Sequence, residues 1–252
     1  MEDEGPVLLT REGSLPGATR LALQDLQPER IVVLGGNGVV SEAVMAELGG
    51  YADEVERVAG SDRYRTAAAI AQEWAASDVV FLASGQDFPD ALSAAAAAGV
   101  EGAPVLLTRQ HGLPGATMAE LERLAPSTVY VIGGDAAVSD EAAQEAGWYA
   151  DEVVRLGGAD RYRTASHVAQ EFFPTPTNEA FLATGMDFPD ALAAAPAAAM
   201  NGGPVLLTRP ASLPSATVTA LDAIRAQTIT LVGGFGAISL EVQETLERHV
   251  YP

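Results

Sequence analysis

The chain has 252 residues, of which 48% are hydrophobic and 6% aromatic, so it can bury a core built mainly from Ala, Val and Leu, and extensive disorder is excluded. Its formal charge of −20, from 34 acidic against 14 basic residues, excludes nucleic-acid binding through the general surface field. The absence of cysteine excludes disulfides and thiolate metal sites, and the apolar runs are too short to span a bilayer.

The first four residues, Met1 to Glu4, lack the basic and apolar regions of a signal peptide. We therefore expect either a cytosolic protein or a piece of a longer exported protein. Residues 7–10 then form the first apolar segment, which predicts a strand.

The next predicted helix begins at Asp62, which can cap it. Tyr64, Ala67, Ala71 and Trp74 share one face of this helix. A continuous apolar strand is expected over residues 79–83.

Asp87 is expected to cap the following helix, with Pro89 near its first position and Asp90 in its first turn. That helix runs through alanines to Gly99, and residues 105–108 form the next strand.

Pro114 begins a further helix, residues 129–132 form a third strand, and Ser139 caps a last helix. Strands without polar alternation are buried on both faces, which favours a parallel sheet covered by helices, a three-layer α/β module. Ligands of such sheets lie beyond the carboxyl ends of the strands, where the loops at Gly85, Arg109 and Gly133 are expected.

Four motifs recur in a fixed order and show that the chain is a tandem repeat. The motif Pro-Val-Leu-Leu-Thr-Arg begins at Pro6, Pro104 and Pro204, so its copies are 98 and then 100 residues apart. The predicted domains are therefore residues 1–50, which carry only the later half of a module, and two full modules over residues 51–150 and 151–252. Truncation is the simplest cause of the half module, and it would explain the absent export signal.

No shared catalytic site is expected. The three histidines, His111, His167 and His249, have no histidine at the equivalent positions of the other modules, and no nucleophile or metalloprotease motif is present. The sequence thus predicts that the chain is not an enzyme and holds no metal or cofactor.

Paired carboxylates do recur, as Asp87 with Asp90 and as Asp187 with Asp190. One interpretation is helix capping and compensation of the helix dipole. The other is hydrogen bonding to a hydroxyl-rich ligand, or holding a cation.

The arginines are the sharpest clue, because lysine is absent and nine of the fourteen arginines lie in the repeated motifs. They could pair inside a module, for example Arg63 with Asp87. Alternatively, they could bind phosphate or carboxylate groups of an acidic polymer. The candidate ligand-binding residues are Arg57, Asp62, Arg63, Asp87, Asp90, Arg109, Arg155, Asp160, Arg161, Asp187, Asp190 and Arg209.

Taken together, the motifs resemble the type 2 cell-wall-binding repeat of surface-layer-associated proteins and autolysins of Gram-positive bacteria. The matching segments of the first full module begin at Arg57, Gly85, Pro104, Leu113 and Gly133. The second full module matches from Arg155 onward, and the resemblance covers essentially the whole chain.

The resemblance implies Toprim-like modules packed on one another around a pseudo-threefold axis, at the cell surface. It also implies non-covalent attachment to an anionic wall polymer. The anchoring segment that it implies is Val105, Leu106 and Leu107, repeated as Val205, Leu206 and Leu207. These are also ordinary core residues of a strand, so their effect on anchoring can act through folding.

Two other functions stay open at this point. One is a wall-lytic enzyme fragment associated with N-acetylmuramoyl-L-alanine amidase, since relatives of this kind bear that name. The other is a binding protein for a small anionic metabolite.

Overall fold

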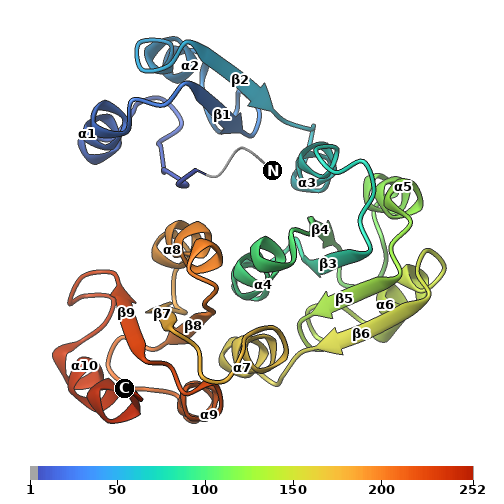
Figure 1. Cartoon of the computed structure of the whole chain (residues 1–252). Helices are drawn as coiled ribbons and strands as arrows, with labels where there is room; N and C mark the ends of the chain where they lie inside the picture. The colour runs from blue at the N-terminus through green and yellow to red at the C-terminus, as the bar shows by residue number, and fades with distance from the viewer. Residues whose placement is uncertain (1–4, 252) are drawn as a thin grey trace.

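The computed structural model describes residues 5–251, so the expectation about Met1 to Glu4 lies outside the described residues. Three parallel sheets define three units in chain order. Figure 1 shows these sheets arranged around the helices α4 and α8.

The first unit covers residues 5–58. Its elements are α1 (Gly17–Leu26), β1 (Arg30–Leu34), α2 (Glu42–Leu48) and β2 (Glu54–Val58). Residues 7–10 are not a strand, which corrects the prediction. In the full units the equivalent strand pairs with a preceding one, and the described part of the first unit offers no such partner.

The second unit covers residues 63–156 and has a four-stranded sheet in the order β4-β3-β5-β6. Its elements are α3 (Arg63–Ala71), β3 (Val79–Ser84), α4 (Pro89–Glu101), β4 (Val105–Thr108), α5 (Gly115–Leu124), β5 (Thr128–Ile132), α6 (Asp140–Ala146) and β6 (Glu152–Leu156).

The third unit covers residues 161–251, and its sheet has the order β8-β7-β9. Its elements are α7 (Arg161–Phe172), β7 (Glu179–Thr184), α8 (Pro189–Met200), β8 (Val205–Thr208), α9 (Ser215–Ile224), β9 (Thr228–Val232), α10 (Leu240–Leu246) and the 3-10 helix η1 (Glu247–His249).

The central strand β3 shows why the sheets lack polar alternation. Val80 and Leu82 point into one apolar cluster, with residues of α3, α5 and α6. Phe81 and Ala83 point into a second cluster, with residues of α4, α7 and α8. The sheet is therefore covered on both faces, and the predicted three-layer α/β fold with parallel sheets is confirmed.

Two strands were missed from the sequence, β2 and β6. Each begins with glutamate and carries an arginine at its fourth position, so neither reads as a buried apolar run. Each completes the sheet of the preceding segment, and the sheets therefore divide the chain near residues 59 and 157, later than residues 50 and 150. The domain boundaries of the modules themselves stay a prediction.

The full units pack on one another through α4, which contacts both α7 and α8. The rings of Phe88 and Phe188 have centroids 5.6 Å apart, and Gly99 lies against Ala199. Small residues along both helices allow this close approach.

Candidate functional site

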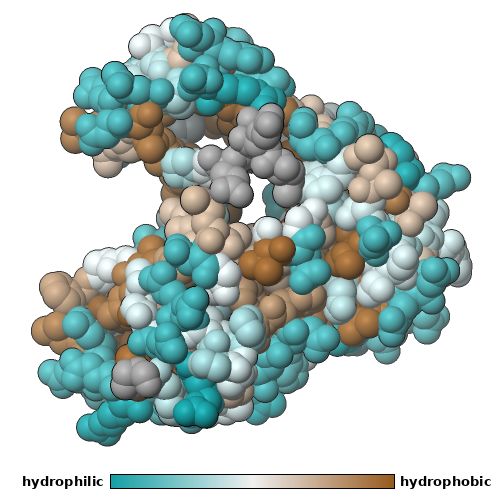
Figure 2. Space-filling view, in the orientation of Figure 1, coloured by the Kyte–Doolittle hydropathy of each residue, from teal (hydrophilic) through white to brown (hydrophobic). Residues whose placement is uncertain are grey.

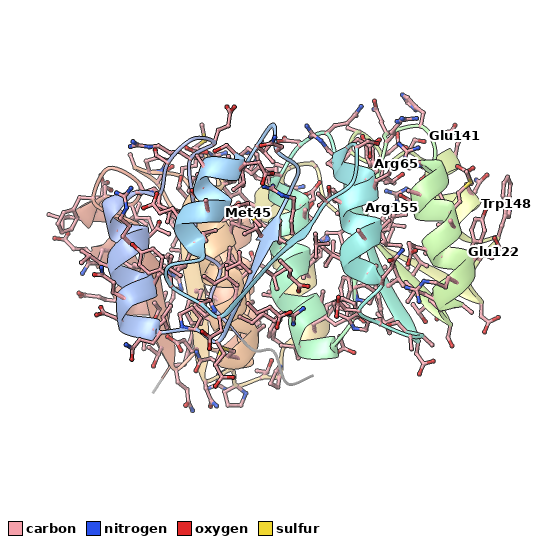
Figure 3. The ribbon with its side chains drawn as sticks, turned by 90° about the horizontal axis from the view of Figure 1, so that it is seen from above. Met45, Arg65, Glu122, Glu141, Trp148 and Arg155 are labelled. Carbon is pink, nitrogen blue, oxygen red and sulfur yellow. The ribbon has the colours of Figure 1, made fainter. Side chains whose placement is uncertain are left out.

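Most of the predicted ligand residues lie at the carboxyl edges of the parallel sheets. The N-termini of the covering helices lie there too, because each helix returns the chain from one edge of the sheet to the other. Figure 3 shows Arg65 of α3 and Glu141 of α6 along this edge, whereas Glu122, near the end of α5, lies away from it.

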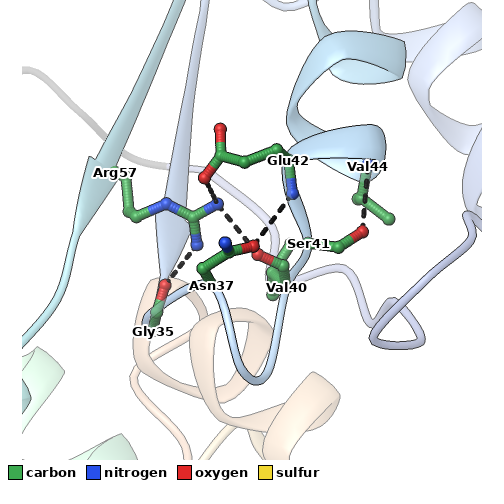
Figure 4. Close-up of polar contacts among 7 residues, drawn as sticks. All are labelled: Gly35, Asn37, Val40, Ser41, Glu42, Val44 and Arg57. Carbon is green, nitrogen blue, oxygen red and sulfur yellow. Dashed lines mark hydrogen bonds and ion pairs between the residues drawn. The ribbon is translucent and has the colours of Figure 1, made fainter. Parts of the chain in front are cut away.

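The side chains of Arg57 and Arg155 donate hydrogen bonds to backbone carbonyls of the loop that follows the neighbouring strand of the same sheet. The guanidinium of Arg57 donates to the carbonyls of Gly35 and Val40 at 2.6 and 2.8 Å and reaches the carboxylate of Glu42 at 3.3 Å (Figure 4). This arrangement holds the loop after β1 closed. A further role in ligand binding stays a prediction for Arg57.

Arg155 repeats the clamp one unit later. It donates to the carbonyls of Gly133 and Val138 at 3.0 and 2.7 Å and pairs with Asp140 at 3.0 Å. Its side chain is 26% exposed, so most of it is enclosed by the loop that it holds.

Asp62 caps α3, as predicted, and the equivalent Asp160 caps α7. Each accepts a hydrogen bond of 2.9 Å from the backbone N–H three residues later. The backbone N–H of Arg65 lowers the pKa of Asp62, and the charge of the Arg65 side chain acts in the same direction. The carboxylate of Asp62 is thus already engaged by its own helix.

Arg63 and Arg161 are equivalent, but their surroundings differ. Both donate to the carbonyl of the glycine that follows the central strand, Gly85 or Gly185. Arg161 also lies over the ring of Phe88 and approaches the carboxylate of Asp87 at 3.5 Å. The acid thus meets the arginine of the following unit, so the expected pairing of Arg63 with Asp87 inside one module is wrong.

Asp87 and Asp187 do not cap their helices. Each carboxylate accepts from the next backbone N–H, that of Phe88 or Phe188, and the phenylalanine occupies the N-cap position. Both aspartates are exposed, so the expected capping role is corrected for both.

Asp90 has a raised pKa, unlike Asp62. Burial raises its pKa, and this outweighs the opposing hydrogen bond from Thr164 and the charge of Arg161. A side-chain carbon on Gly133 would lie 2.5 Å from the Asp90 carboxylate, and the φ of Gly133 is +118°, so only glycine fits there.

Arg109 and Arg209 follow β4 and β8 directly and are open to solvent, whereas Arg63, which is also exposed, donates to the carbonyl of Gly85. They lie over the rings of Tyr64 and Tyr162, with the guanidinium carbon 5.4 and 5.0 Å from the ring centroid. Both are exposed, and neither has a carboxylate partner among the described residues. Their donors are therefore available to a ligand.

The tyrosine platforms were missed as site residues. A side-chain carbon on Gly85 would lie 2.6 Å from the Tyr64 ring, so the ring fills the space that glycine leaves and offers its other face to Arg109. The signal was present in the repeat, because tyrosine follows Asp-Arg in both full modules.

The predicted anchoring segment forms β4 and β8 and belongs to the core. Leu106, Leu206 and Leu207 are each no more than 1% exposed, and Val205 is buried as well. Leu107 and Val105 are partly buried. These contacts favour an effect on anchoring through folding, and direct contact with the wall stays a prediction.

Neither a metal-binding cluster nor a membrane-spanning helix is found among residues 5–251. His167 contacts the carbonyl of Gly157 at 2.8 Å, and His249 contacts Asp222 at 2.7 Å. The three histidines thus lie in unrelated surroundings.

Comparison with known families gives one match, to the model described as "Cell wall binding domain 2 (CWB2)", over residues 57–143 and 155–243. The two matched ranges fall on the second and third units.

Two curated relatives come from Bacillus subtilis (strain 168). N-acetylmuramoyl-L-alanine amidase LytC is 33% identical over 195 residues, which is 77% of this chain and 39% of that protein. The protein named amidase enhancer is 26% identical over 246 residues, which is 98% of this chain and 34% of that protein. The chain thus spans little more than a third of either relative.

Two solved structures from Clostridium difficile share the fold. Cwp6 superposes with a TM-score of 0.88 and 25% identity, over 98% of this chain and 40% of that one. Cwp8 gives a TM-score of 0.84 and 26% identity, over 97% of this chain and 43% of that one.

Proposed function

The chain belongs to the cell wall binding domain 2 family, and from this premise we propose that it attaches non-covalently to an anionic polymer of the cell wall through arginines at the carboxyl edges of its sheets. Binding to the cell wall is the function of the family. The charge of the polymer and the residues that contact it are our proposal.

The observation that carries the proposal is the repeated stacking of Arg109 on Tyr64 and of Arg209 on Tyr162. A guanidinium that rests on a ring keeps its hydrogen-bond donors free, and its planar fork matches phosphate or carboxylate groups. In a chain of charge −20, an acidic polymer must be held by such local contacts, because the overall field repels it.

Two equivalent sites on one chain add by avidity when one polymer reaches both. Each contact can then be weak while the attachment as a whole is firm. Asp87 and Arg161 meet across the joint between the second and third units, so we treat them as contributors to packing first and as polymer contacts second. Arg63 donates to Gly85 of its own unit and stays a candidate polymer contact.

We infer that the chain acts by binding and not by catalysis. One relative is named an amidase and the other an amidase enhancer, and their matches overlap on this chain. The shared region therefore does not by itself imply amidase activity. A polymer ligand is also favoured over a small metabolite, because Arg109 and Arg209 repeat the same open arrangement in two units.

Association with the cell-wall surface follows from the family and from the Cwp structures. We propose that the chain works there as an exported protein. The wall-binding units can serve as the attachment region of a larger protein, because the chain matches only 39% and 34% of the lengths of its two relatives.

A double substitution tests the proposal. The variant Arg109→Gln with Arg209→Gln should bind purified cell walls at least tenfold more weakly in cosedimentation, because each site loses a charge-assisted hydrogen bond worth about 1.5–3 kcal/mol. Each single variant should lose less.

The matched control is Arg225→Gln with Arg248→Gln. It changes the net charge equally, and Arg225 is also stacked, on Tyr251, but both residues follow the C-terminal ends of helices and so lie at the opposite edge. Equal loss of binding in both double variants would show that only total charge matters and would refute the assignment of Arg109 and Arg209.

A further inference from the structure

A polar cavity lies beside Arg109 and has a volume of about 470 Å³. The residues that line it include Gln86, Arg109, Gln110, His111 and Glu145. This volume falls within the range of small-molecule binding sites.

The polar groups of this cavity are available to a ligand. No hydrogen bond or ion pair joins the side chains of Gln86, Gln110 or His111 to any other described residue. Glu145 is held in place because one of its carboxylate oxygens accepts a hydrogen bond of 2.7 Å from the backbone N–H of Leu113. The second carboxylate oxygen of Glu145 is not used by that hydrogen bond.

Among the described residues, the polar lining of this cavity is confined to the second unit. At the equivalent positions the third unit has Met186, Pro210, Ala211 and Thr245, which remove both amides, the imidazole and the carboxylate. Arg209 is retained there. The stacked arginine is therefore common to both units, whereas the polar wall is not.

The first unit does not offer the same cavity either. Glycine stands at the position of His111, as Gly13. Glu47, the equivalent of Glu145, is paired with Arg20 at 2.6 Å. Only the second unit combines an open arginine with free amides.

We propose that this cavity is a specificity site that binds one monosaccharide unit bearing a single acidic group, and this inference rests on the proposed function. Each glutamine amide offers both a donor and an acceptor, which suits neighbouring hydroxyls of a sugar ring. Glu145 and His111 supply further hydroxyl partners, and Arg109 binds the acidic group. The third unit binds the acidic groups of the polymer without selecting the sugar.

Nuclear magnetic resonance of the whole chain tests the proposal directly. The probes are D-glucuronate and α-D-glucose 1-phosphate, which carry a carboxylate or a phosphate, with neutral D-glucose for comparison. We expect saturable shifts of the side-chain amides of Gln86 and Gln110 at millimolar concentrations of an acidic sugar, and at least tenfold weaker binding of glucose. The better of the two acidic probes identifies the group that Arg109 prefers.

Exchanging residues between the units supplies the matched variants. Gln86→Met, His111→Ala and Glu145→Thr give the second unit the residues of the third, whose backbone accommodates them, and should weaken acidic-sugar binding at least tenfold. The reverse set, Met186→Gln, Pro210→Gln, Ala211→His and Thr245→Glu, should create a second site and shifts in the third unit.

Absence of saturable shifts at Gln86 and Gln110 in the folded protein would overturn the inference. So would acidic-sugar binding by the variant Gln86→Met, His111→Ala and Glu145→Thr that equals binding by the unaltered chain. Wall cosedimentation distinguishes this failure from failure of the proposed function. If walls are bound through Arg109 and Arg209 but no sugar enters the cavity, only the specificity site is refuted.

Discussion

At the scale of single residues, the neighbours of each arginine decide its role. Arg57 and Arg155 are surrounded by carbonyls of a loop, whereas Arg109 and Arg209 stand on aromatic rings at the surface. The repeat identified all four, but it could not separate them, because β2 and β6 bring Arg57 and Arg155 against the loops after β1 and β5 only on folding, and the tyrosines reach Arg109 and Arg209 in the same way.

The clamp role predicts that Arg155→Gln destabilises the protein. A glutamine is too short to reach both carbonyls and Asp140, so we expect a loss of roughly 1–3 kcal/mol in unfolding free energy. Arg65→Gln is the control. Arg65 is 61% exposed and pairs with Asp62 at the surface, so its loss should cost less than about 1 kcal/mol.

Thermal unfolding measures both variants, and wall binding by the folded protein separates the two roles of Arg155. If Arg155→Gln left the melting temperature unaltered but abolished wall binding, Arg155 would be a ligand contact and not a clamp.

From the surroundings of Asp90 we predict that its contribution to stability changes with pH in the opposite direction to that of an ordinary salt-bridged acid. Burial raises its pKa in the folded state, so its contribution to stability is largest below the pKa of the unfolded chain and falls as the pH rises through the folded value. Asp90→Asn should therefore raise the melting temperature at neutral pH by roughly 2–4 °C, with little gain at acidic pH.

The control for this prediction is Asp190→Asn, the equivalent change in the first turn of α8. Denaturation curves at several pH values compare the two variants. A lower melting temperature for Asp90→Asn than for Asp190→Asn at neutral pH would show that the hydrogen bond with Thr164 and the charge of Arg161 outweigh burial.

At the scale of elements, apolar runs predicted the buried strands β3, β4 and β5 correctly. The prediction failed where a strand depends on a partner. Residues 7–10 have the sequence of β4 but no strand to pair with, and β2 and β6 look polar because they lie at sheet edges and carry the clamp arginines. Local pattern thus identifies the apolar strands, including the edge strand β4, whereas polar strands such as β2 and β6 follow from tertiary pairing.

The open edge of β1 predicts weak protection from exchange. β5 pairs with β3 on one side and β6 on the other, but β1 pairs with β2 alone. Its unit has a separate small core of Leu15, Leu23, Val33, Val40, Val44 and Leu48. We expect amides of residues 30–34 to exchange at least roughly a hundredfold faster than those of residues 128–132, because local opening exposes few apolar contacts.

Hydrogen exchange followed by mass spectrometry measures this difference. The equally short strand β9, which also lacks its outer neighbour, serves as an internal comparison. Equal protection of β1 and β5 in a demonstrated monomer would contradict the prediction.

At the scale of the whole molecule, the second and third units form one body and the first unit stands apart from the third. Figure 2 shows a notch between the first unit and the unit that contains α8, with apolar residues on its walls. Four large hydrophobic side chains of the first unit are exposed: Leu21, Leu26, Val32 and Leu34. The packing of modules on one another that the resemblance implied is thus found between the two full units, through α4, α7 and α8.

The ligand site could be predicted only in part. The resemblance of the repeats identified the family correctly, and the recurrence of Arg109 and Arg209 drew attention to them. Tyr64 was missed although it recurs as Tyr162 after Asp-Arg, because nothing in the sequence places its ring beside Arg109. Gln86 and His111 could not be recognised, because they come from separate loops that meet only at the carboxyl edge of the folded sheet.

The most direct test of the central claim is cosedimentation of the whole chain with purified cell walls, before and after chemical removal of their secondary anionic polymers. We expect firm binding to intact walls and at least tenfold weaker binding to the stripped walls, with the removed polymer competing for the chain in solution. Undiminished binding to stripped walls would contradict the claim that an anionic polymer is the ligand.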